Sequence, residues 1–181
     1  MRYGNIKYYD IADGEGVRTS LFVSGCTHRC AGCFQPETWD FSYGEEFTDE
    51  VAEKILQSIE PAYVQGITVL GGEPMEPDNQ RALVGFLETA KERHPKKTIW
   101  LYTGDVYEDL IADGPRRTEV TDRLLACVDV LVDGPYVAEL KDITLRFRGS
   151  SNQRIIDLDQ TRRLGRIVLW EDEPVYSTHT M

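Results

Sequence analysis

Three of the four cysteines in this chain, Cys26, Cys30 and Cys33, lie within eight consecutive positions. Their spacing, C-x3-C-x2-C, allows three thiolates on one irregular loop to converge on a single metal centre. Thiolates are soft ligands that suit iron–sulfur clusters, and a cubane cluster takes one cysteine for each iron. Three cysteines therefore leave one iron without a protein ligand, and a reactive metal requires such an open position. The spacing favours a reactive 4Fe-4S cluster.

Two other uses of these cysteines remain open. A structural zinc ion would take His28 as its fourth ligand, but only one residue separates His28 from Cys26. Zinc ligand pairs usually have about two to four residues between them. Free or redox-sensing thiols are the second alternative. The fourth cysteine, Cys127, ends the apolar face of a predicted helix and is expected to lie in the core.

The elements that position the cysteine loop follow from the hydrophobic pattern. An apolar run over 18–24 predicts a buried strand that ends at Gly25, directly before the first cysteine. Thr48 and Asp78 are expected to be the N-caps of two helices. The predicted elements are a short strand over 5–10, strands over 66–70, 97–103 and 129–132, and helices over 48–59, 78–90 and 118–126.

Strands that alternate with helices at about thirty-residue spacing indicate βαβ units and a largely parallel sheet. The 181 residues fall well short of the ~250 residues typical of a closed eight-stranded barrel. We therefore predict an α/β fold, a partial (open) β/α barrel, in a single domain over 1–181. Ligands bind at the carboxyl ends of parallel strands. The loops that follow the four main strands are thus expected to build one site.

Composition narrows the possible functions. The chain has 20 Lys and Arg against 31 Asp and Glu, a net charge of −11, so nucleic-acid binding is not expected. No apolar run approaches the ~18 residues of a membrane span, and the N-terminus lacks the apolar stretch of a signal peptide. We expect a cytoplasmic protein, in which disulfides are rare.

The cysteine loop, together with the Gly-Gly-Glu-Pro loop over 71–74, resembles the radical S-adenosylmethionine superfamily. Within it, the chain resembles the family of anaerobic ribonucleotide reductase activating proteins, over about residues 10–157. The motifs that carry the closer resemblance are Asp-Gly-Glu-Gly-Val-Arg-Thr at 13–19, the loop at 25–33, Tyr-Thr-Gly at 102–104, Asp-Val-Leu-Val-Asp-Gly at 129–134 and Phe-Arg-Gly-Ser-Ser-Asn-Gln-Arg at 147–154.

This resemblance implies a 4Fe-4S cluster on Cys26, Cys30 and Cys33 that binds S-adenosylmethionine through its free iron. A low-potential reductant such as flavodoxin would supply one electron, which cleaves the sulfonium. The resulting 5′-deoxyadenosyl radical would take a hydrogen from a glycine of the large reductase subunit. The cofactors would carry the difficult chemistry, while the protein binds, orients and shields them.

Cofactor contacts are expected at the ends of the strands. Gly71 and Gly72 have no side chain to hold the methionine end of S-adenosylmethionine away from the backbone, and Glu73 would fix the loop or contact the cofactor ammonium. Thr103 and Asp133 would contact the ribose or order the mouth of the site. An ordinary turn is the alternative for the two glycines, Thr103 and Asp133, and a solvated surface carboxylate is the alternative for Glu73.

The resemblance puts adenine contacts at Gly32 and Phe34, which flank the last cysteine. Phe34 would equally serve to exclude water from the cluster. The segment 148–152 would form a nest of N–H donors or a surface turn. The chain departs from the family pattern at Gln35, where an Asn is usual, and at Glu73, where many members have Asp. Both departures bear on which partner is served.

The expected function is therefore that of an oxidoreductase that activates a glycyl-radical reductase. A radical enzyme that acts on another glycyl-radical protein or on a small molecule is an alternative, and a non-catalytic module with structural zinc is another. The small size favours a protein substrate, because an open sheet leaves a side that a partner's loop can enter. An electron carrier is disfavoured because it would prefer a fully ligated cluster and Cys127 is about ninety positions away.

Overall fold

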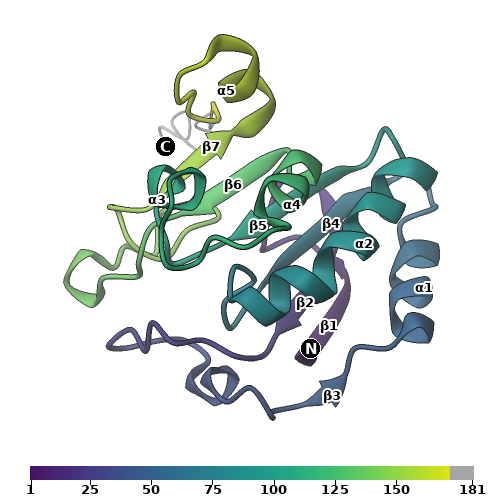
Figure 1. Ribbon diagram of the computed structural model, residues 1–181, viewed down its shortest axis with the longest axis horizontal. Helices are drawn as coiled ribbons and strands as arrows, with labels where there is room; N and C mark the ends of the chain where they lie inside the picture. Colours follow the sequence, from purple (N-terminus) through teal and green to yellow (C-terminus); the bar gives the residue numbers. More distant parts are fainter. Residues whose placement is uncertain (172–181) are drawn as a thin grey trace, which may run out of the picture.

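A computed structural model describes residues 1–171 of the chain. All its strands belong to one open sheet in the order β3-β1-β2-β4-β5-β6-β7 (Figure 1). The strands are β1 Arg2–Asp10, β2 Val17–Val23, β3 Glu45–Glu46, β4 Val64–Gly71, β5 Thr98–Tyr102, β6 Val130–Asp133 and β7 Arg154–Asp157. The helices are α1 Asp49–Ser58, α2 Pro77–Arg93, α3 Tyr107–Ile111, α4 Thr121–Cys127 and α5 Leu158–Leu164, with 3-10 turns η1 Pro36–Trp39 and η2 Ala138–Leu140.

The α/β class and the open sheet agree with the prediction, but the expectation of a largely parallel sheet is wrong. Only the central pairs β2–β4, β4–β5 and β5–β6 are parallel. The pairs β1–β2, β1–β3 and β6–β7 are antiparallel. Parallel neighbours need a long crossover, usually helical. The segments that lead from β1 to β2 and from β6 to β7 contain no α-helix, and the chain returns alongside the strand it has just left.

The two faces of the sheet differ because side chains alternate along each strand. On β2, Leu21 and Val23 join the main apolar core, to which α1, α2 and α4 contribute their inward faces (Figure 1). The other face carries a smaller cluster built on Trp100, whose ring packs edge-on against Phe147 and Trp170. The helices therefore cover one face, and loops cover the other.

Helix boundaries follow local chemistry. The Thr48 hydroxyl accepts a hydrogen bond from the Val51 amide at 3.4 Å, which confirms the predicted N-cap of α1. The predicted cap at Asp78 is wrong, because α2 begins at Pro77 after Glu76. Proline at the first helical position lacks an N–H that would be unpaired there in any case.

Arg18 is a fully buried cation on the loop-covered face of the sheet. Its side chain is 1% exposed and donates to the Thr68 hydroxyl at 2.8 Å, the Ile67 carbonyl at 2.7 Å and the Thr98 carbonyl at 2.8 Å. Burial lowers the pKa of Arg18 to about 10, so the guanidinium remains charged at neutral pH. Its hydrogen bonds join β2, β4 and β5.

Replacing Arg18 with Met should lower the free energy of unfolding by about 3 kcal/mol, because several buried acceptors lose their donor. Urea unfolding followed by circular dichroism measures this change. Arg93→Met is the matched control, since Arg93 pairs with Glu53 at the surface, and it should leave the unfolding midpoint nearly unchanged. Equal midpoints for both variants would show that Arg18 does not hold the strands together.

Candidate metal centre

The loops that follow β2, β4, β5 and β6 meet around a cavity of about 480 Å³. All three clustered cysteines line it, as do five of the other residues expected to contact a cofactor: Phe34, Gly71, Gly72, Glu73 and Thr103. Gly32 and Asp133 are not among the residues of its wall. One edge of the sheet thus brings together most of the predicted site.

The cysteine loop is held in an irregular shape by backbone contacts. The Gly25 amide donates to the Thr38 carbonyl at 2.8 Å, and the Cys33 amide donates to the Cys30 carbonyl at 3.1 Å. Gly25 has a φ of 94°, and a side chain there would lie 2.4 Å from the ring of Phe41. Glycine is therefore required at the residue before the first cysteine.

The first cysteine is the most buried of the three. Cys26 is 8% exposed, whereas Cys30 and Cys33 are partly exposed. Burial raises the pKa of Cys26 to about 11, and the charges of Glu73 and Glu76 act in the same direction. The thiol is therefore protonated without a metal, and metal binding must displace its proton. Three soft donors on one loop fit an iron–sulfur cluster.

The glycine pair after β4 is required by the packing of two backbones. A side chain at Gly71 would lie 2.7 Å from the Val23 amide nitrogen, and one at Gly72 would lie 2.6 Å from the Gly25 carbonyl. The Gly72 amide donates to the Val23 carbonyl at 2.7 Å. These glycines hold the loop after β4 directly against the start of the cysteine loop.

Glu73 anchors neighbouring loops. It is 1% exposed, and its carboxylate accepts hydrogen bonds from the Met75 and Gly104 amides, both at 2.8 Å. The same carboxylate pairs with His28 at 2.9 Å. These contacts hold the loop after β4 in place, which is one of the two roles expected for Glu73.

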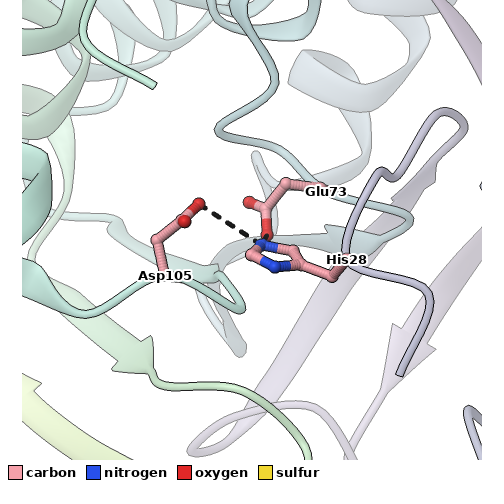
Figure 2. A group of neighbouring side chains, drawn as sticks. All are labelled: His28, Glu73 and Asp105. Atoms are coloured by element: carbon pink, nitrogen blue, oxygen red, sulfur yellow. Dashed lines mark ion pairs between the residues drawn. The ribbon is translucent and has the colours of Figure 1, made fainter. Parts of the chain in front are cut away.

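His28 lies between two carboxylates (Figure 2). Its Nε2 is 2.9 Å from Glu73 and 3.3 Å from Asp105. Hydrogen bonds to Asp105 and then to Glu73 raise the pKa of His28 to about 10, against the effect of burial. Burial raises the pKa of Asp105, but His28 and Arg116 outweigh it and leave that pKa below its ordinary value. His28 thus links the cysteine loop to the loops after β4 and β5 through these two carboxylates.

Thr103 and Asp133 are both buried at strand ends. The Thr103 hydroxyl accepts from the Asp105 amide at 3.1 Å. The Asp133 carboxylate is fully buried; it accepts from the Tyr107 amide at 2.8 Å and from Arg154 Nε at 2.9 Å. Thr103 therefore shapes the cavity wall, and Asp133 supports it from behind.

The remaining predicted positions lie at the mouth of the cavity. The Phe34 ring is 64% exposed, and its centroid is 5.1 Å from that of Tyr136. Gly32 approaches Tyr136 and Ala138, at 3.6 and 3.5 Å from the position of an added Cβ. The amides at 149 and 150, expected to form a nest, donate instead to the side chain of Gln153. The segment 148–152 therefore forms a turn that the side chain of Gln153 closes.

Sequence reasoning missed several polar residues on the cavity wall. Tyr102, Asp13 and Arg148 all line it. Within residues 1–171, the Tyr102 hydroxyl, one Asp13 oxygen and Arg148 Nε are buried without a hydrogen-bond partner. Their only sequence signal was membership of the motifs at 13–19, 102–104 and 147–154. The wall thus offers unsatisfied polar atoms that suit a polar ligand.

Residues 12–156 match the family model for a 4Fe-4S single cluster domain, and a cavity lined by three cysteines fits a protein of this class. The chain is 38% identical to the anaerobic ribonucleoside-triphosphate reductase-activating protein of Pasteurella multocida, over 86% of this chain and 98% of the relative. Proteins of that name from Escherichia coli strain K12 and Enterobacteria phage T4 are each 37% identical, over 84% and 86% of this chain and 96% and 93% of theirs.

The chain belongs to the family of anaerobic ribonucleoside-triphosphate reductase-activating proteins. This confirms the family resemblance predicted from the motifs of the sequence. Among residues 1–171, no helix is both long and apolar enough to span a membrane.

Asp13 gives the metal-free protein a testable pH dependence. Burial and a hydrogen bond to Asp10 raise the pKa of Asp13 from 3.8 to about 7. The unfolded chain releases this proton at lower pH than the folded chain does, so stability falls as pH rises between these two values. Asp13→Asn should remove that loss and become more stable than the wild type by up to about 2 kcal/mol near pH 7, after allowance for solvent screening.

Urea unfolding of the metal-free protein at several pH values between about 4 and 8 measures this difference. Asp113→Asn is the matched control, because the Asp113 side chain is fully exposed. A stability difference between Asp13→Asn and the wild type that does not grow with pH would contradict the prediction.

Proposed function

We propose that this chain is a radical S-adenosylmethionine enzyme that activates an anaerobic ribonucleoside-triphosphate reductase by generating a glycyl radical on it. The observation that carries the proposal is the placement of Cys26, Cys30 and Cys33 on one cavity with the Gly-Gly-Glu loop. Relatives named as activating proteins of this reductase, which align over nearly their whole length, support it.

Cys26, Cys30 and Cys33 would hold the cluster, and one iron would remain free for S-adenosylmethionine. Cys127 does not compete, because it is buried on α4 and its thiol donates to the Arg123 carbonyl at 3.4 Å. A bound cluster would pass one electron from an external reductant to S-adenosylmethionine, which would split into methionine and a 5′-deoxyadenosyl radical, and that radical would take a hydrogen atom from a glycine of the reductase. The chain's own residues position these groups and exclude water.

Gly71 and Gly72 leave backbone surface open to the methionine end of S-adenosylmethionine, and Thr103 lies on the wall nearby for its ribose. Phe34 offers a face for the adenine and shields the last cysteine from water. Glu73 lies on the cavity wall, whereas Gly32 and Asp133 are not among the residues of that wall. They shape the loops that the cofactor touches, as the contacts described above support.

The proposed partner is the glycyl-radical subunit of the reductase, and a flavodoxin-type protein is the proposed source of electrons. We further propose that the protein works in the cytoplasm. The aromatic residues Phe34, Tyr136 and Phe147 on the cavity wall would protect a radical from water while a loop of the partner enters.

Cys30→Ala should prevent cluster assembly and leave the domain folded, because the core of the sheet and helices lies elsewhere. After reconstitution without oxygen, the wild type should hold about four irons and four sulfides per chain, and Cys30→Ala should lose the visible absorption of the cluster. Cys127→Ala is the matched control and should keep it. A zinc-containing, colourless wild type or a fully loaded Cys30→Ala would overturn the assignment.

The reaction itself is tested with the reconstituted protein, a low-potential reductant, S-adenosylmethionine and an anaerobic ribonucleotide reductase. We expect 5′-deoxyadenosine and a glycyl radical signal by electron paramagnetic resonance, both absent with Cys30→Ala. Formation of 5′-deoxyadenosine without a radical on the reductase would refute the proposed partner. No 5′-deoxyadenosine from a loaded cluster in the presence of the reductase would refute the proposed chemistry.

A further inference from the structure

Arg116 reaches the cysteine loop from the segment between α3 and α4, although it lies 89 positions further along the chain than Thr27. Its guanidinium donates to the Thr27 hydroxyl at 2.9 Å and pairs with Asp105 at 3.1 Å. It also pairs with Glu76. Its side chain is only 13% exposed, so these contacts are largely shielded from solvent.

Each of the two residues that follow Cys26 is held by a carboxylate. Glu76, which is 4% exposed, accepts a hydrogen bond from the Thr27 amide at 2.7 Å. Glu73 pairs with His28 at 2.9 Å. The cysteine loop is thus tied to the loops after β4 and β5 and to the segment that carries Arg116.

The charges of this network nearly balance. Glu73, Glu76 and Asp105 are three carboxylates, and the cations among them are Arg116 and His28. His28, Glu73 and Asp105 place ligand atoms within 4.8 Å of one another (Figure 2), close enough for a metal ion. However, the Arg116 guanidinium lies 3.4 Å from His28 Nε2 and 3.1 Å from Asp105, and it already supplies the positive charge there. We therefore assign these residues to loop support.

We propose that Arg116 is a positioning residue for the cluster: it tethers the cysteine loop through Thr27 and, together with Glu76, sets the electrostatic field that fixes the cluster's reduction potential. The proposal rests on the cluster site of the proposed function. Two opposite charges next to the residue that follows Cys26 act in a poorly screened environment. Net charge around a cluster is one of the factors that set its potential.

Tether and charge are separated by three variants. Arg116→Met removes both the tether and the positive charge, and Arg116→Lys keeps the charge. Glu76→Gln removes the negative charge and retains an oxygen that accepts from the Thr27 amide. Arg123→Met is the matched control, because Arg123 pairs with Glu88 on the outside of α4.

The tether is measured on the metal-free protein, as the rate at which iodoacetamide alkylates Cys26, read by peptide mass spectrometry. Arg116→Met should accelerate alkylation several-fold because the loop opens more often. Arg123→Met should stay near the wild-type rate. Circular dichroism confirms that each variant is folded. An unchanged rate in a folded Arg116→Met would overturn the positioning role.

The field is measured as the reduction potential of the reconstituted cluster. Arg116→Met should shift the potential to more negative values and Glu76→Gln to more positive values, and Arg116→Lys should lie near the wild type. Opposite shifts distinguish an electrostatic effect from general loosening of the loop, which would move both variants in one direction. Shifts of the same sign, or no shift, would overturn this part of the proposal.

A wild type that assembles no cluster would refute the proposed function and with it the effect on potential. The alkylation experiment needs no cluster and would still decide whether Arg116 holds the cysteine loop. The two failures can therefore be told apart.

Discussion

The hydrogen-bonded pairing of β2 with β4 continues past the ends of both strands, and the site depends on this continuation. Val23 pairs with Gly71 at the end of the register. Beyond it, the Gly72 amide donates to the Val23 carbonyl at 2.7 Å and the Glu73 amide donates to the Gly25 carbonyl at 2.8 Å. The cysteine loop and the Gly-Gly-Glu loop are therefore fixed to each other by backbone alone, before any side chain or cofactor contributes. Glycine is required at 71 and 72, because a Cβ there would lie 2.7 Å from the Val23 nitrogen and 2.6 Å from the Gly25 carbonyl oxygen.

The register of β2 determines this alignment, and both faces of the sheet specify it. Leu21 enters the core under the helices, and Arg18 points to the other face, where its guanidinium finds acceptors on β4 and β5. A slip of one residue would expose the apolar side chains and place a charge in the apolar core. The buried arginine, distant from the metal centre, thus helps to align the loops that form it.

Local patterns predicted the parts of the site that are local in sequence. The cysteine spacing, the glycine pair and the strand ends identified eight of the residues that line the cavity, because each signal lies within a few residues. Pairing direction has no such signal, and the antiparallel returns of β1 and β7 were missed. Arg116 and Asp105 were missed because charged loop residues usually lie in solvent. Asp133 was expected to contact the ribose or to order the mouth of the site; its carboxylate accepts from Arg154, 21 positions away, a partner that no local pattern indicates.

The environment of Cys26 differs from that of a nucleophilic cysteine and suits a metal ligand. Burial, with the nearby carboxylates, raises the pKa of Cys26 to about 11. Reactive cysteines have the opposite environment, in which positive charge lowers the thiol pKa and maintains the nucleophilic thiolate. The two cations at the cysteine loop, His28 within it and Arg116 beside it, pair with carboxylates instead. A thiol in this field loses its proton when a metal replaces it. Burial, with a smaller contribution from Glu73 and Glu76, thus keeps the Cys26 thiol protonated in the metal-free protein.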